Sequence, residues 1–241
     1  MRINLHYSLQ FHYLLPIIFA AGNIKSCGPY ILKIIQQYSS LAATLPHYLY
    51  FNGNFEDDEH KTRLATDMTV IENFITEDEE KKLLDELEPY MKNLKYERSH
   101  WDGAIEGYRE TERLNWNEEN TKIINRVREL AFGKGMQPLR YVHVLDLKEE
   151  GVIKPHIDSV RFCGSTIAGI SLLSDSVMRL QHDKDKSKIL DIFLKRRSLY
   201  IMSGVARYDY THEILGNEES KFGDVVVKKT RRISVICRNE P

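Results

Sequence analysis

The residues best suited to chemistry lie in the stretch Pro155-His156-Ile157-Asp158. Successive side chains of an extended strand alternate between its two faces, so the imidazole of His156 and the carboxylate of Asp158 project to the same side. A second imidazole, for which His212 is the candidate, would complete a set of two histidines and one carboxylate. Such a set holds divalent iron and leaves coordination positions open for a substrate and for oxygen. The sequence therefore predicts a metal site formed by His156, Asp158 and His212.

A stretch near the C-terminus adds a second chemical element. Residues 232–238 are expected to form a strand, in which Ile233, Val235 and Cys237 make one apolar face. The opposite face carries two guanidinium groups and is formed by Arg232, Ser234, Ile236 and Arg238. A guanidinium that points inward needs an anion, and a carboxylate can accept two hydrogen bonds from it. The pattern thus predicts a dicarboxylate co-substrate beside the metal.

Each of these residues also has a simpler structural interpretation. His-x-Asp pairs are frequent on surface strands, and His212 could be a core histidine whose imidazole bonds a backbone carbonyl. Arg232 could form a salt bridge at the rim of the fold, and Tyr200 could simply be packed with its hydroxyl satisfied. The remaining histidines of this region, His143 and His182, are interpreted as structural or exposed, because the ligand set is complete without them.

Composition limits the class of protein. The chain has 241 residues, of which 42% are hydrophobic and 29% are charged, enough for one large β domain or two small ones. The formal net charge of -1 gives no overall basic field of the kind that nucleic-acid binders show, although a local groove could be basic. Cys27, Cys163 and Cys237 are few and odd in number, which favours a reducing compartment over a disulfide framework.

The N-terminal segment differs in composition from the rest. No acidic residue occurs before Glu56, and the segment is rich in aromatic and aliphatic residues, which is typical of a targeting peptide. We interpret residues 1–60 as a mitochondrial targeting peptide and linker, disordered and outside the fold. Residues 54–63 read as a solvated linker. The apolar run at residues 13–21 could instead belong to a secretory signal. It is too short for a membrane-spanning helix and is interrupted by Pro16.

Two helices are expected before the β-rich half. Residues 68–71 read as a strand, and Thr76 followed by Glu79 forms a capping box that begins the first helix. Its core face is expected to consist of Leu83, Leu84, Leu87, Met91 and Leu94. The second helix is expected over residues 121–132, with a buried side formed by Ile123, Ile124, Val127 and Leu130. Glycines at 133 and 135 end it.

Residues 96–116, between these helices, combine Trp101, Tyr108 and Trp116 with two glycines and many charges. The segment is expected to be irregular. It could be a substrate lid with stacking aromatic residues or an ordinary surface loop.

From residue 139 onward the segments are short, rich in β-branched residues and separated by turns. The expected strands number about eight and cover residues 141–147, 152–156, 167–173, 177–180, 189–193, 198–202, 212–215 and 231–238. Two helices followed by such a run predict a mainly β protein with supporting helices. The expected architecture is a double-stranded β-helix, or jelly roll, whose helices cover one outer face.

The motifs His156-x-Asp158, His212 and Arg232 with Arg238 six residues later resemble those of the AlkB family of Fe(II)/2-oxoglutarate-dependent dioxygenases. The stretches Lys-Pro-His-Ile-Asp-Ser and Arg-Arg-Ile-Ser-Val-Ile-Cys-Arg are most similar to a mitochondrial branch of that family. The likeness covers roughly residues 70–241 and is most specific from Tyr141 onward. It implies one dioxygenase domain over residues 61–241.

The resemblance implies a role for each candidate residue. The metal ligands would bind Fe(II), and Arg232 would pair with the distal carboxylate of the co-substrate 2-oxoglutarate. Arg238 would lie by its metal-binding end, and Tyr200 would donate a hydrogen bond to it. Ser234, on the same face as the two arginines, completes the expected co-substrate set.

One departure from the family pattern bears on the substrate. Relatives that repair nucleic acids carry Asn-x-Tyr on the strand before His-x-Asp, where this chain has Leu145 and Leu147. The segment 96–116 also lacks the run of Lys and Arg that would grip a phosphate backbone. The branch resemblance implies a protein or small-molecule substrate in the mitochondrial matrix, with links to fatty-acid metabolism and programmed necrosis. Demethylation of N-methyl RNA and a non-catalytic binding module remain alternatives, and the oligomeric state is open.

Overall fold

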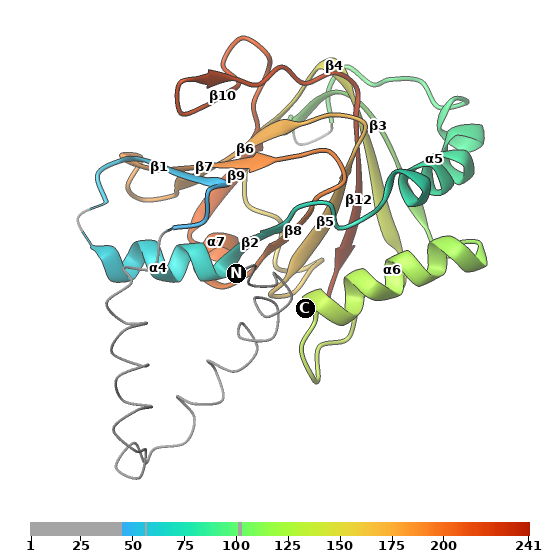
Figure 1. Cartoon of the computed structure of the whole chain (residues 1–241), viewed down its shortest axis with the longest axis horizontal. Coiled ribbons are helices and arrows are strands. Elements are labelled where there is room, and N and C mark those ends of the chain that lie inside the picture. Colours follow the sequence, from blue (N-terminus) through green and yellow to red (C-terminus); the bar gives the residue numbers. More distant parts are fainter. Residues whose placement is uncertain (1–44, 56, 101–102) are drawn as a thin grey trace, which may run out of the picture. The chain divides into compact units, whose positions relative to one another are not determined.

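A computed structural model of the chain describes residues 45–55, 57–100 and 103–241, and their fold is mainly antiparallel β (Figure 1). Ten strands form one sheet: β1 (Leu49–Gly53), β2 (Met68–Ile71), β3 (Ile105–Arg113), β4 (Val142–His156), β5 (Ile167–Leu172), β6 (Ser176–His182), β7 (Lys188–Leu194), β8 (Leu199–Met202), β9 (Tyr210–Ile214) and β12 (Arg232–Arg238). A small hairpin is formed by β10 (Lys221–Phe222) and β11 (Val225–Val226). The helices are α4 (Asp58–Asp67), α5 (Glu77–Met91), α6 (Glu118–Ala131) and α7 (Gly204–Tyr208).

The long strand β4 joins the two halves of the sheet. The strand order is β1-β7-β6-β9-β4-β12-β5-β8-β2, and β3 also pairs with β4. The sheet curls so that its two halves face each other across one core, which includes Leu180 and Ile192 from one half and Leu147 and Met202 from the other. The curled antiparallel sheet agrees with the predicted jelly roll.

A second core lies between the sheet and the helices α5 and α6, which lie side by side on one flank of the sheet (Figure 1). Thr76 and Glu79 form the predicted capping box at the start of α5, and the helix buries Leu83, Leu87 and Met91. Helix α6 begins three residues earlier than expected, because the Asn117 side chain accepts a hydrogen bond from the backbone N–H of Asn120. Its expected face is confirmed for Ile123, Ile124 and Val127. Leu130 was placed on that face wrongly, since it is 43% exposed.

Four local expectations differ from the structure. The prediction of a linker over residues 54–63 is wrong for its second half, where helix α4 begins. Asp57 caps this helix, and the helix buries Leu64. The domain boundary expected at residue 60 therefore falls inside α4, and β1 upstream of it pairs with β7. The irregular segment expected over residues 96–116 contains strand β3, paired along β4. The strands expected over 141–147 and 152–156 are one continuous strand, β4.

The targeting peptide expected at the N-terminus falls mostly on residues 1–44, which lie outside the described residues. Within the described part of the chain, no helix has the length and apolar character needed to cross a membrane.

Candidate metal centre

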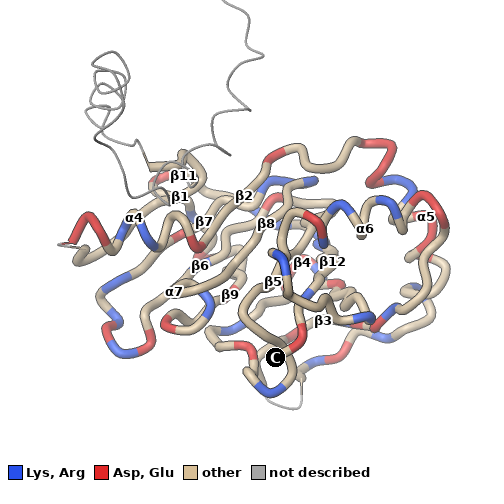
Figure 2. Tube along the Cα trace, turned by 90° about the horizontal axis from the view of Figure 1, so that it is seen from below, with Lys and Arg blue, Asp and Glu red and all other residues tan. Residues whose placement is uncertain are grey.

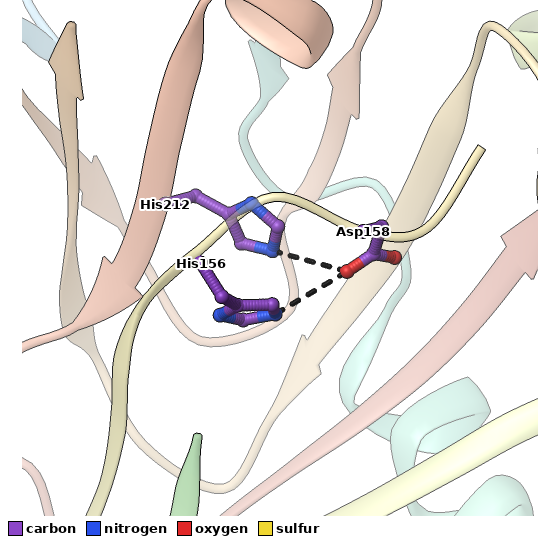
Figure 3. Close-up of side chains that lie close together, drawn as sticks. All are labelled: His156, Asp158 and His212. Carbon is purple, nitrogen blue, oxygen red and sulfur yellow. Dashed lines mark ion pairs between the residues drawn. The ribbon is translucent and has the colours of Figure 1, made fainter. Parts of the chain in front are cut away.

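Strand pairing brings the two candidate imidazoles together. His156 is the last residue of β4 and lies directly opposite His212 of β9 in the antiparallel register. Side chains of opposite residues project to the same face of a sheet, and the centres of the two rings are 4.3 Å apart. Asp158 follows two residues after the end of β4 and turns its carboxylate toward both rings (Figure 3). The three side chains are thus gathered at one point.

The three groups offer ligand atoms to a common point. Asp158 Oδ1 lies 3.3 Å from His156 Nε2 and 3.6 Å from His212 Nε2. One ligand atom from each residue lies within 4.8 Å of the other two. Among the described residues, no other group of three or more His, Cys, Asp or Glu side chains meets this criterion. These distances suit a single cation between the three atoms.

The protonation states also suit a cation. His156 Nδ1 is 2.8 Å from the carbonyl oxygen of Lys154, which only accepts, so Nδ1 carries a proton and Nε2, which faces Asp158, is the nitrogen that a metal ion would bind. Burial, together with the nearby His156, lowers the pKa of His212 to about 3, so that its imidazole is neutral. Burial alone would raise the pKa of Asp158. The hydrogen bond with His156 and the charge of Arg238 outweigh burial and hold that pKa well below its usual value.

The outer oxygen of the same carboxylate has partners of its own. Asp158 Oδ2 accepts a hydrogen bond of 3.0 Å from Arg238 Nε. Burial lowers the pKa of Arg238, but its ion pair with Asp158 raises the pKa overall, so this guanidinium stays charged. Cys163 Sγ is 4.0 Å from the same oxygen and accepts a hydrogen bond from Arg207. Asp158 Oδ2 therefore has partners of its own, while Oδ1 faces the two imidazoles.

The polar face of β12 meets these residues in one cavity. The candidate ligands share the lining of this cavity with Arg232, Ser234, Ile236 and Arg238, which alternate along β12 as expected. The intervening residues Ile233, Val235 and Cys237 lie in the other core. The empty space of the cavity, counted out to solvent, is about 490 Å³.

Arg232 is a buried cation inside this cavity. Only 2% of it is exposed, and its guanidinium donates hydrogen bonds to the hydroxyls of Ser234 and Ser171. It forms no ion pair with a carboxylate among the described residues, and its Nε has no hydrogen-bond partner there. Burial lowers its pKa to about 10, so it remains charged at neutral pH. An uncompensated buried charge is costly, and a bound anion would remove that cost.

Tyr200 completes the wall of the cavity, and a residue missed at the sequence level makes room for it. Tyr200 of β8 lies opposite Gly169 of β5. A Cβ at position 169 would lie 2.5 to 2.7 Å from the Tyr200 ring and hydroxyl, so a larger residue would displace that ring. Burial raises the pKa of Tyr200, which keeps its hydroxyl protonated as a donor.

Two further residues near the site were also missed or undervalued. Ser171 accepts a hydrogen bond from Arg232, but β5 is buried at every position, so alternation could not single it out. His143, interpreted from sequence as structural, lines the cavity and contacts Arg238. Of the aromatic residues considered for a substrate lid, Trp101 lies outside the described residues. Trp116 packs against the core between the sheet and helices α5 and α6, and the Arg113 guanidinium lies over its ring.

The donor set suits iron, and the unpaired guanidinium that lines the cavity suits a carboxylate. Two neutral imidazole nitrogens and one carboxylate leave a divalent cation with net positive charge and open positions on the cavity side. The only buried guanidinium of the cavity without a carboxylate partner among the described residues is that of Arg232. The arrangement can therefore hold a metal ion at one end and the free carboxylate of a metal-bound acid at the other.

Comparisons with known proteins agree along most of the chain. The family model of the 2OG-Fe(II) oxygenase superfamily matches residues 67–238. The chain is 52% identical over 180 residues to the alpha-ketoglutarate-dependent dioxygenase alkB homolog 7, mitochondrial, of Bos taurus, covering 75% of this chain and 81% of that protein. The Mus musculus protein of the same name is 52% identical over 179 residues, covering 74% and 81%. Among solved structures, OsALKBH1 superposes with a TM-score of 0.51 at 14% identity, covering 71% of this chain and 97% of that one, which shows a shared fold.

Proposed function

Because the chain belongs to the 2OG-Fe(II) oxygenase superfamily and is a dioxygenase of the alkB homolog 7 type that uses Fe(II), 2-oxoglutarate and O2, we propose that it hydroxylates a side chain of a protein in mitochondria. In this proposal His156, Asp158 and His212 hold the iron. Tyr200, Arg232, Ser234 and Arg238 bind 2-oxoglutarate. The observation that carries these assignments is the buried guanidinium of Arg232, which faces the candidate ligands across one cavity without a carboxylate partner among the described residues.

The chain's own residues bind and orient the reactants. Arg232 would hold the distal carboxylate of 2-oxoglutarate, with its fork positioned by Ser234 and Ser171. The hydroxyl of Tyr200 would donate to the same acid. Iron and 2-oxoglutarate, when bound, supply the oxidising chemistry, in which oxidative decarboxylation of the acid to succinate activates O2 toward a C–H bond. The apolar wall that includes Leu145 limits the water around them.

The surroundings of the cavity support a polypeptide rather than a nucleic acid as substrate. A groove that shares Ile153 and Ile214 with the cavity is lined by six glutamates and one lysine: Glu106, Glu149, Glu150, Glu213, Glu218, Glu219 and Lys154. Such a surface repels a phosphate backbone. Over the rest of the described chain, acidic and basic residues are interspersed, as Figure 2 shows.

The proposed location in the mitochondrial matrix has two supports. The similar proteins of Bos taurus and Mus musculus are named mitochondrial, and the segment before Glu56 of this chain has the acid-free composition of a targeting peptide. The resemblance to this branch is also the basis for proposing a link to fatty-acid metabolism and programmed necrosis.

The choice of substrate can be tested with ¹⁸O₂. The full-length protein, loaded anaerobically with Fe(II) and 2-oxoglutarate, is mixed with either mitochondrial matrix polypeptides or N-methylated RNA before labelled oxygen is admitted. We expect a polypeptide to gain one ¹⁸O atom on a side chain, as detected by mass spectrometry, in proportion to succinate. Exposed Asp183→Asn is the matched protein control, and Asp158→Asn should give no label.

Two outcomes would contradict the proposal. Release of formaldehyde from the RNA, with no labelled polypeptide, would make the protein an N-methyl RNA demethylase. Iron binding without any oxygen-dependent succinate, in the presence of either substrate pool, would favour a binding module that retains the metal.

A further inference from the structure

We propose that Glu110 and His143 are positioning residues that hold Arg238 on the outer oxygen of Asp158 and so keep Asp158 a ligand through one oxygen only. This inference rests on the proposed roles of Asp158 and Arg238 in the site. It adds two residues, Glu110 of β3 and His143 of β4, that are outside the set proposed to bind iron and 2-oxoglutarate. We refer to Glu110, His143 and Arg238 together as the relay.

The relay is a continuous chain of short contacts. Glu110 Oε2 lies 2.8 Å from His143 Nε2, and His143 Nδ1 lies 3.2 Å from a terminal nitrogen of Arg238. Arg238 Nε then lies 3.0 Å from Asp158 Oδ2. The chain crosses three neighbouring strands, because β3 and β12 both pair with β4. Glu112 and Ile236 lie opposite His143 in the register, so Glu110 and Arg238 reach His143 as diagonal neighbours, two residues along each strand.

The chemistry of arginine sets the direction of every bond in the relay. A guanidinium can only donate, so His143 Nδ1 must accept, which places the imidazole proton on Nε2. That proton is donated to Glu110 Oε2. The hydrogen bond from His143 outweighs burial and lowers the pKa of Glu110, so the acceptor at the end of the relay is ionised. Glu110 thus fixes the tautomer of His143, and this tautomer is the one that can receive Arg238.

The consequence falls on how Asp158 presents its oxygens. Arg238 occupies Oδ2, while Oδ1 faces the two imidazoles. If Glu110 no longer fixes His143, Arg238 loses one of its two anchors and can rotate away from Oδ2. Both oxygens of Asp158 would then be available to a metal, and the second oxygen would compete for a position that the co-substrate needs. The relay therefore protects an open coordination position.

The test measures anaerobic binding of 2-oxoglutarate to the Fe(II)-loaded full-length protein through the charge-transfer absorption of the complex. Removing a partner of a metal ligand typically costs about 10- to 100-fold. We expect Glu110→Leu to weaken the binding of 2-oxoglutarate about tenfold, at the low end of that range. The substitution should also shift the charge-transfer absorption band. Glu110→Gln keeps an oxygen acceptor for His143 and should restore both properties to within about twofold, a change of about 0.4 kcal/mol. Glu129→Leu, which replaces an exposed glutamate on α6, is the control and should match the wild-type protein.

Two further variants make the result decisive. His143→Phe keeps a ring but has neither nitrogen, and it should reproduce the tenfold loss if Glu110→Leu does not fold. In an Arg238→Met background, Glu110→Leu should cause no additional loss, because residues acting through one contact are not additive. Unchanged affinity and absorption in both Glu110→Leu and His143→Phe would overturn the relay. Absence of the charge-transfer band from the wild-type protein would instead overturn the proposed site itself.

Discussion

Replacing Asp158 with asparagine should lower 2-oxoglutarate-dependent succinate formation by more than about 100-fold, the upper end of what removing an outer partner of a metal ligand costs. The substitution keeps the size of the side chain but removes the only negative charge among the three candidate ligands. His212 is neutral, and His156 would bind a metal through Nε2 as a neutral imidazole with its proton on Nδ1, so the variant has no charge to balance a divalent cation. Iron affinity and turnover should fall together.

Asp183→Asn provides the matched control, because that carboxylate is exposed. Its ion pair with Lys186 is exposed as well. Surface ion pairs of this kind contribute little to stability. Succinate formation is measured under saturating 2-oxoglutarate, and iron content is measured on the same samples. Turnover of Asp158→Asn within tenfold of the wild-type rate would show that Asp158 is not a ligand.

Replacing Arg232 with methionine should weaken 2-oxoglutarate binding by about 10²-fold to a few thousandfold, while iron affinity changes much less. Breaking a buried ion pair by removing one partner costs about 3–5 kcal/mol, and about 1.4 kcal/mol corresponds to a factor of ten. The side chain is 2% exposed, so solvent would not compensate the bound carboxylate. The affinity is measured by anaerobic titration of the Fe(II)-loaded protein.

The same variant also has an expected effect on stability without co-substrate. The buried guanidinium has no carboxylate partner among the described residues, and burial disfavours its charge, so Arg232→Met should be no less stable than the wild type in urea. Added 2-oxoglutarate should stabilise the wild type and not the variant, since a ligand stabilises only the state that binds it. Exposed Arg63→Met is the control. Equal co-substrate affinity in Arg232→Met and wild type would refute this role of Arg232.

Periodic patterns made much of the fold predictable. The alternation along residues 232–238 correctly separated the cavity-facing Arg232 and Ser234 from the core-facing Val235. The capping box placed the start of α5 correctly. These features follow from local chemistry, because a strand repeats every two residues and a helix end must satisfy its first N–H groups.

Elements that depend on tertiary contacts were not predictable in this way. Strand β3 has the sequence Ile-Glu-Gly-Tyr-Arg-Glu-Thr-Glu-Arg, which lacks an apolar face, and it is held by pairing with β4 and by ion pairs such as Arg109 with Asp146. Helix α4 has few apolar residues, and Leu64 alone is buried among its described side chains. Their stability comes from neighbours that are distant in sequence.

The candidate site was predictable in its residue types but not in its supports. The sequence could group His156, Asp158 and His212 as candidates, because the first two are separated by one residue and the third follows from the ligand set. It could not reveal that Gly169 makes space for Tyr200, or that Glu110 reaches His143 from another strand. Both relations arise from strand register across the sheet, which no local pattern encodes.

The most direct test of the proposed site is a crystal structure of the protein with Mn(II) and 2-oxoglutarate, using anomalous scattering to locate the metal. We predict a single metal peak bonded to His156 Nε2, His212 Nε2 and one oxygen of Asp158, with the distal carboxylate of 2-oxoglutarate on the Arg232 guanidinium. A metal peak away from these three side chains, or a 2-oxoglutarate molecule whose distal carboxylate lies away from Arg232, would contradict the proposed site.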